Sequence, residues 1–331
     1  MGEGRARVAI ALALGLAAAP ASAAEFVMKF GIATVNDSQH HFANIYKEAL
    51  EKASGGRIEV QVYPASQLGA IPVEIQGVQI GSIQAFMGPV DFFTGIDQRF
   101  SVFSAPMLFR DEANAAAAVH DPALEEATLK IAEPKGLVGM AMMMVGASHY
   151  AAKKPILRLA DFQGKKLRIN GSDLERAKMS KLGATGVGMA LSEVMPALDQ
   201  GVIDGTISGF AVFVPFKMNT LVKVVTVTND TMLVSIAAVS KRWLDGLPPD
   251  LSKLVLDTGR KLEAEGQAYE ATTMVQLEQQ WIQMGGEVHH LPPEDMAKLK
   301  TLLTPVGDEV TASQPPVHAM LEQVRAAKAK H

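Results

Sequence analysis

The sequence predicts an α/β fold with a length suited to two domains. Segments with the two-residue alternation of strands follow segments with the helical spacing of apolar residues along the whole chain. About 307 of the 331 residues remain after a predicted signal sequence of 24 residues, and chains of that length usually divide into two domains. There is no cysteine, so the hydrophobic core must hold the fold without disulfides or thiolate metal sites.

The first 24 residues are predicted to be a cleaved secretory signal peptide. Arg5 and Arg7 precede the uncharged apolar run Val8–Ala19, and the small residues 21–23 match the requirement of a signal peptidase. The run is too short to cross a bilayer comfortably, and a buried core helix is the alternative. Cleavage after Ala23 or Ala24 would export the mature protein to the periplasm. No later segment is apolar for long enough to span a membrane.

The first half of the mature chain alternates between strand and helix patterns. The predicted strands are 26–34, 55–64, 83–90 and the apolar run 136–146, and the predicted helices are 42–52 and 72–82. The methionines in 140–144 are interpreted as core packing rather than as a sulfur-based metal site, because methionine commonly fills gaps in cores.

The second half continues the same alternation. Leu167, Arg168, Ile169 and Asn170 alternate as in a short strand, and Ser192 is predicted to cap a helix that ends near Gly201. A valine-rich strand is expected within 219–229. A long helix should begin after Pro248 and Pro249 and stop at Gly285 and Gly286, with a bend or break at Gly259 and Gly266.

The sequence offers little support for catalysis, metal binding or nucleic-acid binding. Neither histidine pair, His40-His41 or His289-His290, has the spacing of a metal site, and no cofactor motif is present. The glycines of 183–190 do not match a nucleotide fingerprint and are interpreted as a turn into a strand. The net charge is −4 and basic runs are almost absent, which argues against nucleic acid.

Several motifs together resemble the substrate-binding component of a tripartite ATP-independent periplasmic (TRAP) transporter. They are "GGRIEVQVYPASQLG", "APMLF", "KKPILRLADFQGKKLRI", "MALSEVMPALDQGVIDG" and "LPPDL", in that order along the mature chain. The resemblance implies a two-domain periplasmic binding protein of the Venus-flytrap type, with a long helix spanning both domains. It implies domain I at 25–145 plus 234–273 and domain II at 146–233 plus 274–331. It also implies capture of an organic acid for the membrane permease subunits of an ion-gradient-driven symport system, without cofactor, metal or catalysis.

The resemblance assigns the central binding role to Arg168. In the family the arginine of this strand motif pairs with the ligand carboxylate, and a planar guanidinium can give a carboxylate two parallel hydrogen bonds. Without the resemblance, a surface arginine would be the simpler interpretation.

Other positions depart from the family pattern and predict a less polar site. Ser148 stands where sialic-acid-type members have a second arginine, with His149 and Tyr150 beside it, and Leu191 replaces a common aromatic residue. Ser208 replaces a common asparagine. A looser match places Ile71 and Gly88 or Pro89 where acidic or amide groups are frequent. Phe210, Phe213 and Phe216 are candidates either to stack on a ligand or to pack in the core.

The predicted ligand is therefore a monocarboxylate with an apolar or aromatic body, because unpaired buried polar groups are costly. The alternative within the family is a four-carbon dicarboxylate or sugar acid, with His149, Tyr150 or a water in place of the second arginine. Outside the family, an exported hydrolase and a binding protein for an ATP-driven importer or a sensor kinase remain alternatives.

Overall fold

The computed structural model describes residues 24–331. The predicted signal peptide, except for its last residue, lies outside the described residues. Within residues 24–331, no helix combines the length and the apolar character needed to cross a membrane.

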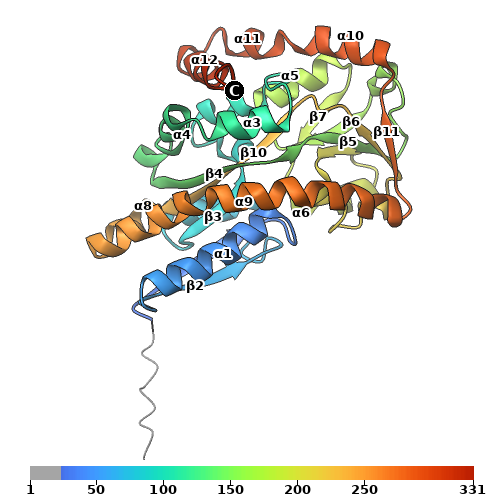
Figure 1. Ribbon diagram of the computed structural model, residues 1–331. Helices are drawn as coiled ribbons and strands as arrows, with labels where there is room; N and C mark the ends of the chain where they lie inside the picture. Colours follow the sequence, from blue (N-terminus) through green and yellow to red (C-terminus); the bar gives the residue numbers. More distant parts are fainter. Residues whose placement is uncertain (1–23) are drawn as a thin grey trace, which may run out of the picture.

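The first of two sheets contains five strands in the order β2-β1-β3-β10-β4 (Figure 1). Its strands are β1 (Phe26–Ile32), β2 (Ile58–Tyr63), β3 (Ala85–Pro89), β4 (Leu137–Ala147) and β10 (Met232–Ser240). β1 pairs in parallel with β2 and β3, whereas β10 is antiparallel to β3 and β4. Helices α1 (Ser38–Ala53) and α2 (Ile71–Ile80) connect the parallel strands. They cover the sheet, whose strand side chains are buried, as helices between parallel strands usually do.

The second sheet contains six strands in the order β11-β9-β5-β8-β6-β7. Its strands are β5 (His149–Ala152), β6 (Lys166–Ile169), β7 (Thr185–Gly188), β8 (Gly205–Ser208), β9 (Val224–Val227) and β11 (Glu287–His290). The helices between them are α5 (Asp173–Lys181), α6 (Leu191–Asp199) and α7 (Phe210–Phe213). The predicted α/β alternation is therefore confirmed.

The chain crosses between the sheets on ordered segments. β4 continues into β5 through Ser148, and β9 leads into β10 through residues 228–231. The third connection is α9 (Pro249–Gln283), which contacts α1 and β4 beside the first sheet and α7 and β11 beside the second.

The prediction was a bend or a break in this long helix; a break is wrong, because α9 is continuous over 35 residues. A Cβ on Gly259 would lie 2.5 Å from the Met140 carbonyl oxygen, and one on Gly266 would lie 2.7 Å from Met143 Sδ. The two glycines therefore allow α9 to lie close against β4. The packing of α9 against β4 therefore explains these two glycines, although glycine has a low intrinsic helix propensity.

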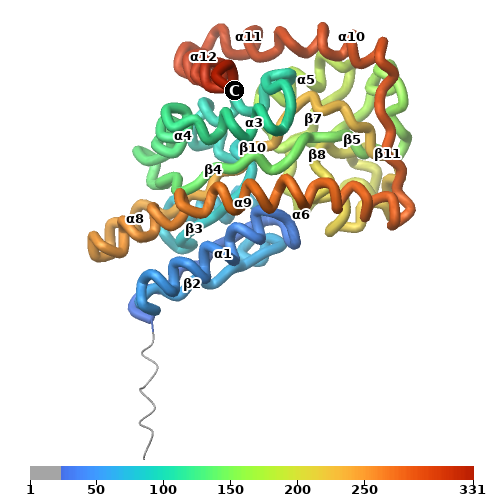
Figure 2. Tube along the Cα trace, viewed as in Figure 1, coloured from blue at the N-terminus to red at the C-terminus, as the bar shows by residue number. Residues whose placement is uncertain are grey.

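The C-terminal helices return across the molecule from the second sheet towards the first (Figure 2). α10 (Pro293–Leu303) and α11 (Val306–Thr311) contact α5, whereas α12 (Pro315–Lys328) packs on α3 (Glu112–Val119) and the 3-10 helix η2 (Gln98–Ser104). The predicted boundary at 273/274 falls inside α9. The division into domains stays a prediction.

The remaining elements are short. They are α4 (Pro122–Leu129), α8 (Lys241–Asp245) and the 3-10 helices η1 (Val90–Phe93), η3 (Glu133–Lys135), η4 (Leu159–Phe162) and η5 (Met218–Thr220). The α6 helix begins one residue before the predicted Ser192 cap, and the Glu193 carboxylate accepts a hydrogen bond from Ala190 N at 2.9 Å.

Candidate functional site

An enclosed cavity lies between the two sheets. Its walls come from the ends of β1 and β3, from η1, from the crossing segments, and from β6, β8, α5, α6 and α7. About 50 Å³ is open to the centres of water-sized molecules, which is room for a few waters because one needs about 10–15 Å³ by that measure. The lining residues are Ala33, Thr34, Asp37, Gln39, Ile71, Pro89, Asp91, Phe92, Val145, Ser148, Arg168, Asn170, Glu175, Lys178, Leu191, Ile207, Ser208, Gly209, Ala211, Val212, Thr231 and Leu233.

Arg168 presents a buried guanidinium to this cavity. Arg168 is 2% exposed. Its Nε donates a hydrogen bond to the Met189 carbonyl oxygen at 3.0 Å, and its Cζ lies 5.8 Å from the centroid of the Phe92 ring. Within residues 24–331, Arg168 makes no second hydrogen bond and no salt bridge. The Nε contact fixes the orientation of the fork and leaves both terminal nitrogens available for an anion.

Arg168 remains a cation despite its burial. Desolvation lowers the pKa of the guanidinium to about 10, and the nearby carboxylates of Glu175 and Asp91 oppose that shift. A pKa of about 10 leaves the group protonated at neutral pH. The cavity therefore contains a fixed positive charge in a region of low dielectric, where a carboxylate would be attracted strongly.

Glu175 is occupied in holding the loop that follows β6. Its Oε1 accepts from Asn170 N at 3.2 Å, and its Oε2 accepts from Gly171 N at 2.8 Å and Ser172 N at 3.1 Å. Ser172 Oγ in turn accepts from Glu175 N at 3.2 Å, which completes a capping box for α5. This carboxylate is committed to local structure rather than to a ligand.

Lys178 is the second buried cation of the cavity wall. Its Nζ lies 3.1 Å from Asp230 Oδ1 and donates to Thr231 Oγ1 at 3.0 Å, and the Tyr150 hydroxyl donates to Asp230 Oδ2 at 2.5 Å. Lys178 and Asp230 are each 1% exposed or less in their side chains. The pair is internally neutral, so Arg168 is the cation without a protein counter-ion among the lining residues.

A hydrogen bond joins the two sides of the cleft beside Arg168. Asn170 Nδ2, just after β6, donates to Asp91 Oδ2 in η1 at 3.3 Å. Burial and the charge of Glu175 raise the pKa of Asp91 to about 7, opposed by hydrogen bonds that include one from Ser104. Asp91 is thus an aspartate whose charge changes near neutral pH in the wall of the cavity.

Two serines contribute hydroxyl groups to the cavity wall. Ser148 Oγ is buried without a hydrogen-bond partner, and Ser208 lies in the wall at the end of β8. Much of the rest of the wall is apolar, including the predicted position Leu191 and the loosely matched Ile71. Arg168, Ser148, Ser208 and Leu191 therefore meet at one cavity, and their contact with a ligand stays a prediction.

The predicted aromatic positions lie behind the wall rather than on it. Phe210 and Phe213 pack on each other and on Trp281, with ring centroids 5.9 to 6.5 Å apart. The His149 ring lies 5.2 Å from that of Phe210, and burial lowers the pKa of His149 to about 4. Tyr150 is committed to Asp230. These four side chains are not among those that line the cavity, so the structure places them in the core of the second sheet.

Gly88 and Phe216 also lie outside the lining set. A Cβ on Gly88 would lie 2.6 Å from Phe86 Cζ, so this glycine accommodates the neighbouring ring. Its sequence neighbour Pro89 lines the cavity. Phe216 is partly buried and packs against the core.

Sequence reasoning missed Asp91, Phe92, Asn170 and Lys178 as lining residues. One signal was available, because Asn170 follows Arg168 by two residues and therefore lies on the same side of the strand. Within residues 24–331, the side-chain groups with metal-binding geometry lie outside the cavity.

Comparison with known proteins gives a family and close relatives in sequence. A model described as bacterial extracellular solute-binding protein, family 7, matches residues 31–314. The C4-dicarboxylate-binding periplasmic protein of Rhodobacter capsulatus is 34% identical over 301 residues, which is 88% of each chain. The 2,3-diketo-L-gulonate-binding periplasmic protein of Escherichia coli is 28% identical over 256 residues, covering 75% of this chain and 78% of its own.

Solved structures share the fold. A TRAP periplasmic solute-binding protein from Desulfovibrio salexigens with bound orotic acid superposes with a TM-score of 0.86 at 20% identity, over 92% of this chain and 99% of its own. One from Shewanella oneidensis with bound succinate has a TM-score of 0.85 at 23% identity, with the same coverage. The predicted two-domain binding-protein fold with a long spanning helix is confirmed.

Proposed function

Since the chain belongs to bacterial extracellular solute-binding protein family 7, we propose that its cavity captures a compact organic monocarboxylate for delivery to a TRAP permease. The protein is a substrate-binding protein and not an enzyme, like the relatives and structures it matches. The identity of the acid and the partner permease are the parts proposed here.

The observation that carries the proposal is the free guanidinium fork of Arg168. Its Nε is fixed by a backbone carbonyl, and its terminal nitrogens face a cavity in which the other cation, Lys178, already has a counter-ion. A carboxylate bound to both terminal nitrogens would satisfy the fork and neutralise the buried charge. The single guanidinium of Arg168 can therefore bind the single carboxylate of one monocarboxylic acid.

The rest of the wall favours a body with few polar groups. Asp91, Asn170 and Glu175 already have hydrogen-bond partners in the protein, so a ligand needs few polar groups to satisfy them. Ile71, Phe92, Leu191 and other apolar side chains form the surface left for the ligand. An apolar or aromatic body suits this surface because burying it removes apolar area from water at no cost in hydrogen bonds.

A four-carbon dicarboxylate is the second candidate. The Rhodobacter capsulatus relative, at 34% identity, is named for binding C4-dicarboxylates. A second carboxylate could accept hydrogen bonds from Ser148, whose hydroxyl is unpartnered within the described protein, and from Ser208 in the cavity wall. Two serine hydroxyls stabilise a buried charge less than a guanidinium does, which is why the monocarboxylate is favoured.

The proposed mechanism is closure of the two lobes around the acid. By the predicted division, Arg168 and Asn170 belong to domain II, and Asp91 and Phe92 belong to domain I; these two domains are the lobes. The Asn170–Asp91 hydrogen bond can form only when the lobes are together, so it contributes to the closed state. Closure excludes water around the ion pair and strengthens it, and the closed form would be the one that the permease recognises.

The proposed location is the periplasm. The family is one of extracellular solute-binding proteins, and residues 1–24 have the composition of a secretory signal peptide. Amino-terminal sequencing of the exported protein should begin at Ala24 or Glu25.

A thermal-shift panel tests the choice of ligand. The mature protein is melted with aromatic, branched aliphatic, keto, dicarboxylic and sugar acids. A true ligand at a thousandfold its dissociation constant adds ~4 kcal/mol, which should raise Tm by roughly 6 °C for a chain of this length. The largest shift should come from an apolar monoacid. Larger shifts with diacids or sugar acids would contradict the monocarboxylate.

A further inference from the structure

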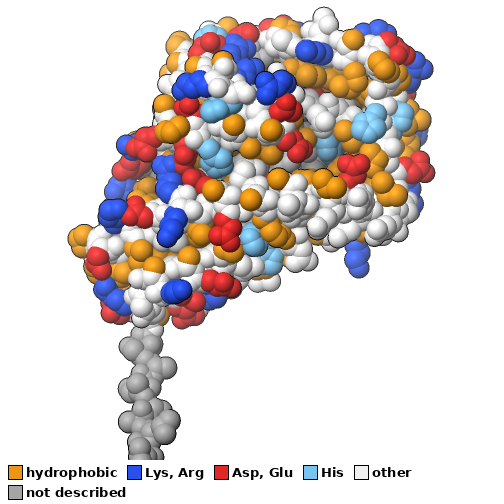
Figure 3. Space-filling model, viewed as in Figure 1, with side chains coloured by type: hydrophobic (Ala, Val, Ile, Leu, Met, Phe, Trp, Pro, Cys, Tyr) orange, Lys and Arg blue, Asp and Glu red, His pale blue; other side chains and the backbone are white. Residues whose placement is uncertain are grey.

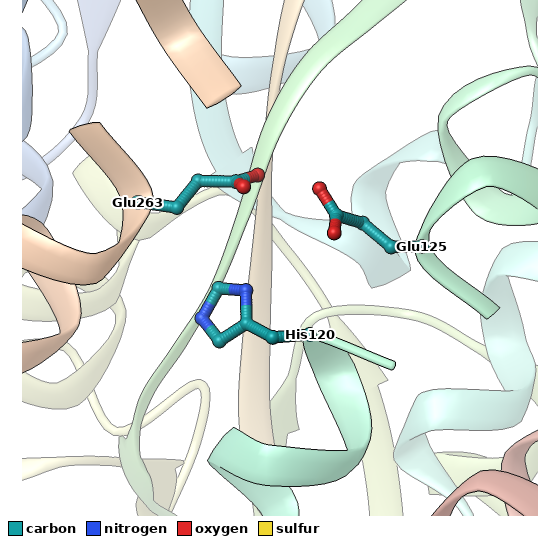
Figure 4. Close-up of side chains that lie close together, drawn as sticks. All are labelled: His120, Glu125 and Glu263. Carbon is teal, nitrogen blue, oxygen red and sulfur yellow. The ribbon is translucent and has the colours of Figure 1, made fainter. Parts of the chain in front are cut away.

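Three side chains with metal-binding atoms converge at a second place, far from Arg168 in sequence and outside the acid cavity. His120 caps the C-terminus of α3, Glu125 lies in α4, and Glu263 lies in α9. Figure 4 shows the two carboxylates pointing towards each other from opposite sides, with the imidazole ring of His120 directed at the space between them. One potential ligand atom from each residue lies within 4.8 Å of the others.

Within residues 24–331, one buried atom of this group lacks a hydrogen bond. His120 Nε2 is buried and has no hydrogen-bond partner. Glu263 is 6% exposed, and its Oε1 accepts a single hydrogen bond, from Met142 N at 2.7 Å. The other ring nitrogen, Nδ1, is the one on the side of the two carboxylates (Figure 4), so it is the imidazole atom available to an ion held between them.

The charges at this point also favour a cation. Arg260 pairs with Glu125 and with the exposed Glu126. One guanidinium thus pairs with two carboxylates, and the carboxyl group of Glu263 lies beside that of Glu125. Acidic and basic side chains lie among apolar ones on the surface over α4 (Figure 3).

We propose that His120, Glu125 and Glu263 bind one divalent transition-metal ion with the ligand preferences of Zn²⁺. An imidazole nitrogen with two carboxylates is a donor set that zinc accepts, and a water would complete four-coordination. Donor atoms in a tetrahedral zinc site are about 3.3 Å apart, so small side-chain rotations must bring the three groups together. Met142 N orients the Glu263 carboxylate, as outer hydrogen bonds commonly do at metal sites.

The consequence of metal binding is a cross-link between α3, α4 and α9. His120 and Glu263 are more than a hundred residues apart in sequence. The ion would hold the long helix against the first sheet. This inference is independent of the proposed acid, because none of the three residues lines the acid cavity.

The test is a melting experiment on the mature, EDTA-treated and dialysed protein with Zn²⁺ alone. Zinc at a hundredfold its dissociation constant should raise Tm by about 4 °C, and calorimetry should give one ion per chain at this site. The Glu263→Gln variant keeps the shape of the neutral side chain and should fold, but it should lose the zinc-dependent shift. The His120→Asn variant should lose it as well, which covers the case of a misfolded glutamate variant.

A matched control comes from a second group of similar composition. Asp308, His318 and Glu322 also lie close enough for a metal, but Arg325 pairs with both carboxylates and the two acids are more than half exposed in their side chains. The His318→Asn variant should keep the full zinc-dependent shift. The proposal is overturned if zinc leaves Tm of the wild type unchanged. It is also overturned if the shift persists in both Glu263→Gln and His120→Asn, or disappears in His318→Asn.

Discussion

Replacing Arg168 by alanine should abolish tight binding of the acid while leaving the fold intact. Arg168 is 2% exposed and makes no salt bridge within the described protein, so in the variant a bound carboxylate would lose its buried cationic partner. Breaking a buried charge pair costs ~3–5 kcal/mol, which weakens affinity by several hundred- to several thousand-fold. Without ligand, Tm should change little, because removing a desolvated cation offsets the lost hydrogen bond to Met189.

Isothermal titration calorimetry with the best acid of the panel measures this effect. Arg168→Lys keeps the charge but not the planar fork, so it should lose on the order of tenfold. Arg176→Ala is the matched control, because its side chain is 52% exposed and pairs only with Asp173 and a backbone carbonyl. That variant should bind within about threefold of the wild type. An Arg168→Ala protein that binds the acid as tightly as wild type would refute the assignment.

Three further predictions concern the cavity and the buried acids. The Ser148→Arg variant places a long cation in a cavity with about 50 Å³ of open space. Calorimetry should show at least tenfold weaker binding of an apolar monoacid and a gain in the affinity for succinate relative to that monoacid. Unchanged selectivity would mean that Ser148 does not face the ligand. Burial raises the pKa of Asp91 to about 7, and ionised Asp91 repels a neighbouring carboxylate, so the Kd for the acid should rise as pH increases from 6 to 8. The Asp91→Asn variant should flatten this dependence, and a variant whose Kd follows the same pH profile as wild type would contradict the prediction. Burial raises the pKa of Glu270 to about 8, so between the unfolded pKa and pH 8 the folded state binds one more proton than the unfolded state, and stability is lost as pH rises towards 8. Between pH 6 and 9, Tm of the Glu270→Gln variant should therefore fall less than Tm of the wild type. Equal changes of Tm with pH in the two proteins would exclude Glu270 as the cause.

The sequence predicted the fold class because local periodicity reports local structure. Apolar alternation and helical spacing placed the elements around β1, α1 and β6 within a few residues. The continuity of α9 was not predictable from propensity, since Gly259 and Gly266 are explained by the close approach of β4. That contact joins residues more than a hundred positions apart, and periodicity carries no information on it.

The candidate site was only partly visible in the sequence for a similar reason. Arg168 could be singled out because its motif has a fixed position, and Asn170 shares its side of the strand. Periodicity marks Phe210 and Phe213 as buried, but it does not say whether a buried ring faces a cavity or the core behind it. The pairing of Lys178 with Asp230 depends on a tertiary contact, so no sequence pattern indicates that Lys178 is neutralised while Arg168 makes no salt bridge.

A crystal structure of the mature protein with the acid that gives the largest thermal shift tests the central claim most directly. The account predicts both carboxylate oxygens within hydrogen-bond distance of the two terminal nitrogens of Arg168, with the body of the acid against Phe92 and Leu191. A carboxylate bound at Lys178 instead, or an acid bound outside the cavity between the sheets, would contradict it.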